Sequence, residues 1–155
     1  MFLPNCESSV NSRDKQVRIL IVEDDFVSRK LLLKIMSPIG ECDAACNGKE
    51  AWEAFGAAHA EGNGYDLILL DIMMPEMDGR EVLSRIREYE NSGGAKVAKT
   101  ARIAMATHIG DKETVIKSFR DQCDGYITKP YTRDSMLADL RKYGLLPAVR
   151  TGAGD

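Results

Sequence analysis

The sequence predicts an α/β fold in which one five-stranded parallel sheet carries helices on both faces. Three observations lead to this prediction. Short apolar runs recur along the chain, amphipathic helical patterns lie between them, and turn or capping residues separate the two kinds of segment. Strands that alternate with helices form parallel sheets with right-handed crossovers, so a doubly wound sheet is the expected arrangement.

The first strand and the first helix open the domain. Residues 17–22 form an apolar run with a single charge, which is typical of a strand buried in a parallel sheet. Residues 26–36 then place apolar side chains three and four positions apart, which predicts one buried face of a helix. Pro38 and Gly40 are expected to end this helix.

A second strand, a second helix and a third strand follow. Residues 41–46 give the weakest of the strand patterns. Asn47 begins a capping box with Glu50 three residues later, and the helix is expected to run to about His59. Residues 67–70 are uniformly apolar and predict a buried strand.

The middle of the chain predicts a third helix, a loop and a fourth strand. Asp78 repeats the capping-box pattern ahead of apolar residues at helical spacing. Residues 91–100 are rich in Gly, Ala and Lys, which indicates a surface loop that is long for such a connection. This loop is either a tolerated insertion or an adaptation for a partner. The fourth strand is predicted at residues 103–106.

Two further helices and the fifth strand complete the pattern. Asp111 is a candidate N-cap for the fourth helix, and Thr132 is a candidate N-cap for the fifth. Each precedes apolar residues at helical spacing, and the fifth strand is predicted between them at residues 125–128. We find no internal repeat and no second domain in the sequence.

Length and composition fit one globular domain in the cytoplasm. The chain has 155 residues, 44% of them hydrophobic, and a net charge of -3, so nucleic acid is not an expected ligand. It has no secretory signal pattern, no membrane span, for which about 20 apolar residues are needed, and no metal-type cysteine spacing. The domain is expected at residues 17–146, with a flexible arm at 1–16 and a flexible tail at 147–155.

Polar residues stand at the ends of four of the predicted strands. Glu23 and Asp24 follow the first strand, Asp71 follows the third, Thr107 follows the fourth and Lys129 follows the fifth. The carboxyl ends of parallel strands meet at one edge of a sheet, where open α/β folds bind ligands. We therefore expect three acids, a hydroxyl and an ammonium group in one crevice, with Asp71 exposed at its strand tip.

This set of groups suits a divalent cation and a phosphoryl group. Ionised carboxylates repel one another until a cation enters, and oxygen ligands favour Mg²⁺ or Mn²⁺ over Zn²⁺. Asp71 can then attack phosphorus and form an acyl phosphate, while Lys129 and Thr107 contact the phosphoryl oxygens. Taken singly, the same residues also fit a solvated acidic turn, a loop lysine and a capping threonine.

Together these residues lie in motifs that resemble the receiver domain of two-component response regulators. The resemblance extends from about Val17 to Leu146. The matching segments are Val22-Glu23-Asp24-Asp25, Asp71-Ile72-Met73-Met74-Pro75-Glu76-Met77-Asp78-Gly79, Met105-Ala106-Thr107 and Tyr126-Ile127-Thr128-Lys129-Pro130. The resemblance implies a flavodoxin-like (CheY-like) fold with strand order 2-1-3-4-5, five flanking helices and a cis peptide bond before Pro130.

The resemblance also implies a role for each residue of the site. Asp71 would accept a phosphoryl group from a histidine kinase or a histidine phosphotransfer protein. Asp24 would bind Mg²⁺ directly, and Glu23 would act mainly through a water molecule. The backbone carbonyl of Met73 would supply another oxygen. Asp25 is instead predicted to cap the following helix.

A conformational switch is implied as well. In the family, the phosphoryl group draws the hydroxyl of the residue at the position of Thr107 inward and vacates space for the aromatic at the position of Tyr126. Tyr126 would rotate from exposed to buried and alter the face made by the fourth helix, fifth strand and fifth helix; static packing is the alternative. His108 either contacts the phosphoryl site or tunes hydrolysis, or it is exposed without a role.

Three classes of function remain open from the sequence. The leading hypothesis is a signalling switch and not an enzyme. This switch is either a free-standing protein or a module of a hybrid histidine kinase. A phosphorylation-linked dimer is a possible form of it. The second class is an aspartate-nucleophile phosphatase. Such enzymes have an Asp-x-Asp motif after the first strand, where this chain has Glu23-Asp24-Asp25. A scaffold that binds partners without phosphorylation is the third class, but the complete set of acids, threonine and lysine argues against it. The initial Met1 favours the free-standing form.

Overall fold

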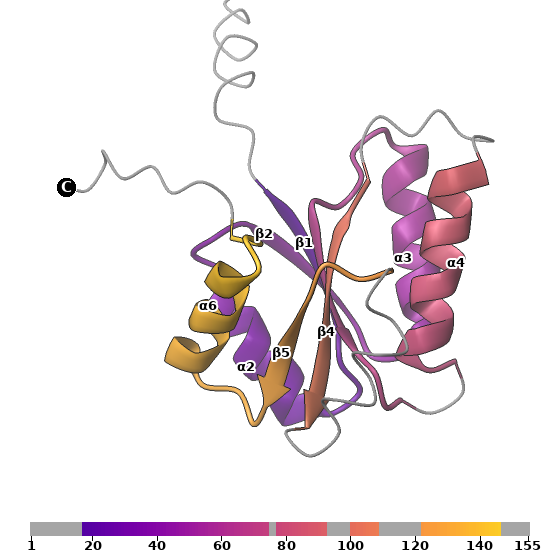
Figure 1. Cartoon of the computed structure of the whole chain (residues 1–155). Coiled ribbons are helices and arrows are strands. Elements are labelled where there is room, and N and C mark those ends of the chain that lie inside the picture. Colours follow the sequence, from indigo (N-terminus) through magenta and orange to yellow (C-terminus); the bar gives the residue numbers. More distant parts are fainter. Residues whose placement is uncertain (1–16, 75–76, 93–99, 109–121, 147–155) are drawn as a thin grey trace, which may run out of the picture.

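The structure is a computed structural model that shows a single parallel sheet with helices on both faces (Figure 1). It describes residues 17–74, 77–92, 100–108 and 122–146. The predicted features that lie outside the described residues are the arm at 1–16, the tail at 147–155, most of the loop at 91–100 and the fourth helix after Asp111.

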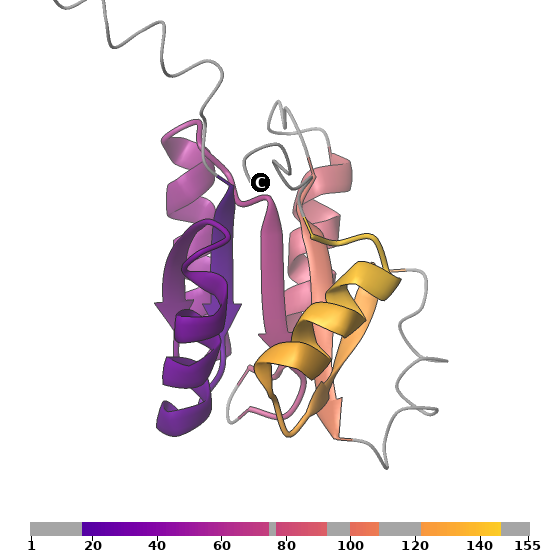
Figure 2. The same cartoon turned by 90° about the vertical axis from the view of Figure 1, so that its left-hand side faces the viewer.

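Five parallel strands form the sheet in the order β2-β1-β3-β4-β5, as predicted. The strands are β1 (Arg18–Val22), β2 (Glu41–Ala45), β3 (Leu67–Asp71), β4 (Arg102–His108) and β5 (Gly125–Lys129). The strand arrows in Figure 2 point in one direction, so the carboxyl ends of the strands lie at the same edge. The register pairs Val22 with Leu70 and Asp71 with Ala106, which places the ends of β1, β3 and β4 side by side.

Strand β4 is longer than the sequence predicted. The prediction ended this strand at Ala106, but Thr107 pairs with Thr128 and His108 pairs with Lys129 in β5. The polar character of the last two residues suggested a loop. Their backbone groups extend the ladder because β5 continues beside them to the same edge.

Four helices are present in the described part of the chain: α2 (Phe26–Met36), α3 (Gly48–Ala60), α4 (Gly79–Ser92) and α6 (Arg133–Lys142). Helices α2 and α6 cover one face of the sheet, and α3 and α4 cover the other (Figure 1). Helix α4 includes the first two residues of the predicted loop at 91–100, and residues 93–99 are not described. Each described helix is too short or too polar to cross a membrane.

Predicted caps begin α3 and α6, with one difference in detail. The Asn47 side chain accepts a hydrogen bond of 2.8 Å from the Glu50 N–H, as a capping box requires. The Glu50 carboxylate, however, accepts from the N–H of Cys46, one residue before the cap. Thr132 and Ser135 form a complete capping box at the start of α6, so the predicted N-cap of this helix is confirmed.

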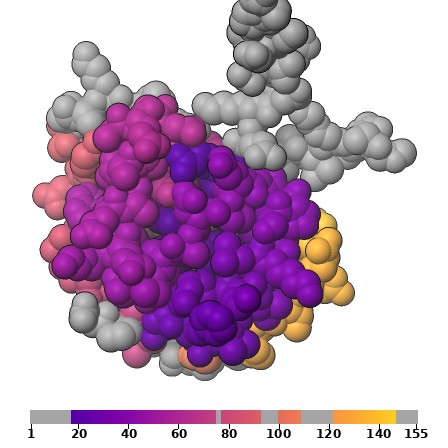
Figure 3. All heavy atoms as spheres, turned by 180° about the vertical axis from the view of Figure 1, so that it is seen from behind, coloured from indigo at the N-terminus to yellow at the C-terminus, as the bar shows by residue number. Residues whose placement is uncertain are grey.

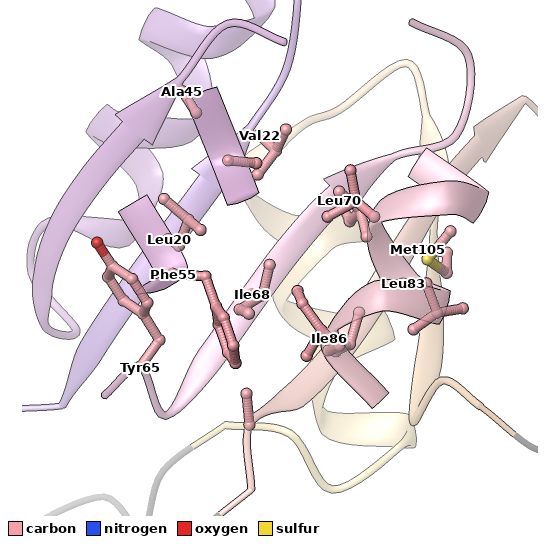
Figure 4. Packing of buried hydrophobic residues seen from close by; sticks show 14 of the residues in the cluster. Leu20, Val22, Ala45, Phe55, Tyr65, Ile68, Leu70, Leu83, Ile86 and Met105 are labelled. Atoms are coloured by element: carbon pink, nitrogen blue, oxygen red, sulfur yellow. The ribbon is translucent and has the colours of Figure 1, made fainter. Parts of the chain in front are cut away.

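The core lies on both faces of the sheet. Leu20, Ile68 and Leu70 point toward α3 and α4, where they pack with Phe55 and Ile86 (Figure 4). Alternate residues of the same strands point to the other face and pack against α2 and α6. Burial on both faces explains why the central strands are uniformly apolar in sequence, and it gives the site a rigid base.

Candidate functional site

The three predicted acids and the lysine meet at the carboxyl edge of the sheet. One carboxylate oxygen from each of Glu23, Asp24 and Asp71 lies within 4.8 Å of the other two, so one cation can contact all three groups. The Lys129 Nζ lies 2.9 Å from Asp71 Oδ1 and 3.5 Å from Glu23 Oε1. Residues at the carboxyl ends of β1, β3 and β5 therefore build a single site.

Asp71 is buried, whereas the sequence predicted an exposed side chain. Its exposed fraction is 2%, and that of Glu23 is 1%. The prediction considered only the end of β3, but the side chain of Lys129 reaches across from β5 and donates a hydrogen bond to the carboxylate. A pocket of about 450 Å³ nevertheless reaches Asp71. It is lined by Glu23, Asp24, Asp25, Val27, Ser28, Leu31, Asp71, Met73, His108, Lys129, Pro130 and Tyr131.

The two oxygens of Asp71 have different surroundings. Oδ1 accepts hydrogen bonds from Lys129 Nζ at 2.9 Å and from the Met73 N–H at 3.3 Å. Oδ2 is buried and has no hydrogen-bond partner among the residues that the structure describes. A buried carboxylate oxygen without a donor is unfavourable, and an oxygen-binding cation would remove that penalty. The oxygen-only set of Glu23, Asp24 and Asp71 thus fits a hard divalent cation.

Burial and charge act in opposite directions on Asp71 and Lys129. Burial raises the pKa of Asp71 to about 7; the hydrogen bond from Lys129 opposes this rise, and the carboxylate of Glu23 adds to it. Burial alone would lower the pKa of Lys129, but its bond to Asp71 and the charges of Asp71 and Glu23 outweigh burial and raise that pKa. The site therefore holds more negative charge than one ammonium group neutralises.

We expect the metal-free protein to lose stability as the pH rises from about 4 to about 7. The pKa of Asp71 is about 7 in the folded protein and about 4 in an unfolded chain, so only the folded state holds a proton in this range. The free energy of unfolding should then fall with rising pH, on the order of a few kcal/mol. Urea unfolding in EDTA at pH 5 and pH 8 measures this loss.

The control for this pH effect is Asp71→Asn, which cannot ionise at that position. The two proteins share all other titrating groups. The difference between their free energies of unfolding should therefore change between the two pH values. An identical pH dependence in both proteins would contradict the assignment. Added Mg²⁺ should reduce the loss, since a cation favours the ionised carboxylates.

The loop between β1 and α2 is held in place by its own hydrogen bonds. The Asp25 carboxylate accepts a bond of 2.8 Å from the Ser28 N–H, which confirms the prediction that Asp25 caps α2. The Asp25 N–H donates to Glu23 Oε2 at 3.3 Å. Arg29 donates to the backbone carbonyls of Glu23 and Asp24. This bonding fixes the loop that carries two of the three acids.

The start of α4 lies directly against the backbone of Asp71. A Cβ atom on Gly79 would overlap the Asp71 carbonyl oxygen, so only glycine permits this approach. The Gly79 N–H donates to the carbonyl of Ile72 at 3.0 Å, and the Asp78 carboxylate caps the helix through the N–H groups of Arg80 and Glu81. Helix α4 therefore anchors the end of β3.

The two predicted switch residues are both buried. The Thr107 hydroxyl donates to the carbonyl of His108 at 3.3 Å. Tyr126 packs edge-on against Tyr143, with ring centroids 6.1 Å apart. The structure therefore shows the buried position that the switch hypothesis assigns to Tyr126, and the rotation itself stays a prediction. His108 is exposed and lines the pocket.

One polar contact in the site was not predicted. The hydroxyl of the buried Tyr131 donates to Glu23 Oε1 at 3.0 Å. Tyr131 directly follows the predicted Lys129-Pro130 pair, whose peptide bond is cis as predicted. The sequence around Tyr131 contains no pattern that predicts a contact between its hydroxyl and Glu23, the acid that follows β1.

Large apolar side chains are also exposed beside the site. Those of Phe26, Val27, Leu31 and Met73 are exposed, and all except Phe26 line the pocket. Figure 3 shows that α2, at the indigo end of the chain, forms part of the molecular surface. We call these four residues the apolar rim. Val27 and Leu31 belong to the helix at 26–36, whose apolar side chains were predicted to form one buried face, and their exposure differs from that prediction.

Residues 19–141 match the response regulator receiver domain family. The chain belongs to this family. The receiver domain is 36% identical over 121 residues to the chemotaxis protein CheY of Halobacterium salinarum, an overlap of 77% of this chain and 90% of that protein. It is 33% identical over 128 residues to the hybrid signal transduction histidine kinase L of Dictyostelium discoideum, an overlap of 82% of this chain and 7% of the kinase.

Solved structures support the same assignment. The CheX-CheY-BeF3-Mg complex from Borrelia burgdorferi includes a chain that matches this receiver domain with a TM-score of 0.66 and 29% identity, over 81% of this chain and 87% of that one. The predicted fold and the predicted resemblance are thus confirmed. The chain is a receiver domain of two-component signalling that spans only a small part of the hybrid kinase it resembles.

Proposed function

We propose that this receiver domain is a phosphoryl-accepting switch whose Asp71 is phosphorylated in a Mg²⁺-dependent reaction. The observation that carries the proposal is the site itself. A buried carboxylate, one oxygen of which has no partner among the described residues, lies beside two further acids and a lysine, and a pocket connects it to the surface. The domain acts in the cytoplasm as a free-standing protein, with a module of a hybrid kinase as the alternative.

The acids and the Met73 carbonyl would hold Mg²⁺, and Mn²⁺ suits the same oxygen ligands. Bound there, the cation neutralises the carboxylates and polarises the phosphoryl group. The Borrelia complex, which contains Mg and the fluoride BeF3, supports such a site in a related protein. Asp24 is exposed and the other two acids are buried, so Asp24 is the acid nearest to solvent.

Asp71 is the proposed nucleophile because its carboxylate lines the pocket and is oriented by hydrogen bonds from Lys129 and the Met73 N–H. A lone pair of the carboxylate attacks phosphorus, and the bond from phosphorus to the donor atom breaks. The departing atom keeps the electron pair. Lys129 can then turn from the carboxylate to the new phosphoryl oxygens, which carry more negative charge.

The signal would leave the site through Thr107 and Tyr126. Thr107 pairs with Thr128, the neighbour of Lys129 in β5, and Tyr126 lies in the same strand as that lysine. The edge-on contact of Tyr126 with Tyr143 couples β5 to the segment after α6. The proposed output face comprises β5, α6 and the fourth predicted helix, which lies outside the described residues.

A protein partner would approach over the apolar rim. A donor that carries phosphohistidine must bring that side chain to Asp71 and so must cover the mouth of the pocket. Apolar side chains gathered at one place on a surface mark protein interaction sites. The rim therefore supports a histidine kinase or a histidine phosphotransfer protein as the partner.

Incubation with acetyl phosphate and Mg²⁺ tests the proposed function. We expect intact mass spectrometry to show one added phosphoryl group per chain and none when EDTA replaces Mg²⁺. Repeated turnover of phosphate esters would instead favour a phosphatase, and no modification would favour a scaffold.

The variant Val27→Ser tests the docking role of the apolar rim. It should slow transfer from a phosphohistidine protein about tenfold and leave transfer from acetyl phosphate unaffected, because Val27 is 71% exposed and contacts only a large donor.

The matched control for Val27→Ser is Ala57→Ser, which makes an exposed apolar residue of α3 polar away from the pocket. This control should transfer at the native rate from both donors. Equal slowing of the two donors by Val27→Ser would argue against a docking role for the rim, since a small donor needs no such contact.

A further inference from the structure

The contact between Tyr131 and Glu23 joins two buried side chains from distant parts of the sequence. The Tyr131 hydroxyl donates to Glu23 Oε1 at 3.0 Å, across 108 residues of chain. Glu23 is 1% exposed and Tyr131 is 7% exposed. Water cannot readily replace this donor, so the bond decides how one oxygen of Glu23 is satisfied.

Among the described residues, three donors face the carboxylate of Glu23, and one of them, Lys129, also binds Asp71. Oε2 accepts from the Asp25 N–H at 3.3 Å, and Oε1 faces both Tyr131 at 3.0 Å and Lys129 at 3.5 Å. Lys129 lies closer to Asp71, at 2.9 Å, and the proposed phosphotransfer draws it toward the phosphoryl group. After Lys129 has moved, Tyr131 is the side chain, among those that the structure describes, that still donates a hydrogen bond to Glu23.

We propose that Tyr131 is a positioning residue, whose hydroxyl orients the Glu23 carboxylate for binding a divalent cation together with Asp24 and Asp71. The inference rests on the proposed function, because it assigns a role within the same metal site. A carboxylate held by donors on both oxygens loses rotational freedom before the cation arrives. Groups that hold a metal-binding side chain in this way affect metal affinity by about 10-fold to 100-fold.

The hydroxyl of Tyr131 is the donor in this bond, and Glu23 Oε1 is the acceptor. The ring also lies 6.0 Å from Lys129 Nζ. Phenylalanine preserves the ring and removes only the hydroxyl, so Tyr131→Phe isolates the hydrogen bond.

The test is Mg²⁺ binding measured by isothermal titration calorimetry. Tyr131→Phe should bind Mg²⁺ about tenfold more weakly than the native protein. The matched control is Tyr65→Phe, which removes a hydroxyl bonded to the carboxylate of Asp43 at 2.7 Å, near the amino ends of the strands. This control should bind Mg²⁺ with native affinity. Thermal unfolding in EDTA checks that all three proteins are folded.

A second measurement separates positioning from a general loss of structure. The Mg²⁺ concentration for half-maximal phosphorylation by acetyl phosphate should rise about tenfold in Tyr131→Phe, while the rate at saturating Mg²⁺ stays native. If the native protein binds Mg²⁺ and the variant binds it equally well or more tightly, this inference is overturned and the proposed function stands. Absence of Mg²⁺ binding by the native protein would overturn both.

Discussion

Replacement of Asp71 by asparagine is expected to abolish phosphorylation from small and protein donors alike. The amide has nearly the shape of the carboxylate, but it lacks the charge and the nucleophilic oxygen that attack on phosphorus requires. Lys129 remains close to Glu23, so the ammonium group keeps a partner in the variant. Intact mass spectrometry after incubation with acetyl phosphate and Mg²⁺ should show only the unmodified chain.

The control for Asp71→Asn is the same change at Asp25. Asparagine caps a helix as well as aspartate does, so Asp25→Asn should keep the start of α2 and remove one negative charge next to the site. This control should still gain a phosphoryl group. A phosphoryl group found on the Asp71→Asn protein, placed elsewhere by peptide mapping, would show that another residue is the acceptor.

Replacement of Lys129 by methionine should lower the free energy of unfolding by about 3 kcal/mol in EDTA at pH 8, because it leaves buried carboxylates without their cation. Methionine has a similar length and no charge, so little packing is lost. Urea unfolding measures the change. Saturating Mg²⁺ should restore part of the stability, since it supplies positive charge to the same oxygens.

Two comparisons show whether the loss arises from uncompensated charge. Lys34→Met changes an exposed lysine of α2 and should alter stability by less than about 0.5 kcal/mol. Adding Asp71→Asn to Lys129→Met should recover much of the loss, because one of the buried negative charges is removed. A double variant as unstable as Lys129→Met alone would point to packing rather than charge.

The fold was predictable because its signals are local. Strand β3 is buried on both faces, and its apolar run carries that information without reference to any other segment. The caps at Asp25 and Thr132 lie within a few residues of the helices they begin. The end of β4 was missed because pairing of Thr107 and His108 depends on β5, which is distant in sequence.

The residues that form the candidate site were predictable from the sequence. Their burial and their hydrogen bonds were less so. The order of the strands brings Glu23, Asp71 and Lys129 to one edge, and this follows from the motifs alone. The bond from Lys129 to Asp71 and the bond from Tyr131 to Glu23 both join side chains that are distant in sequence. Such contacts between side chains leave no periodic pattern in the sequence.

The balance of ionised groups at the edge of the sheet has a consequence for which ions can settle there. Three carboxylates and one ammonium group sum to a charge of −2 when all are ionised. A divalent ion brings that sum to zero, a sodium or potassium ion leaves it negative, and a trivalent ion overshoots. Valence thus complements ligand chemistry as a filter, and it acts before any donor arrives.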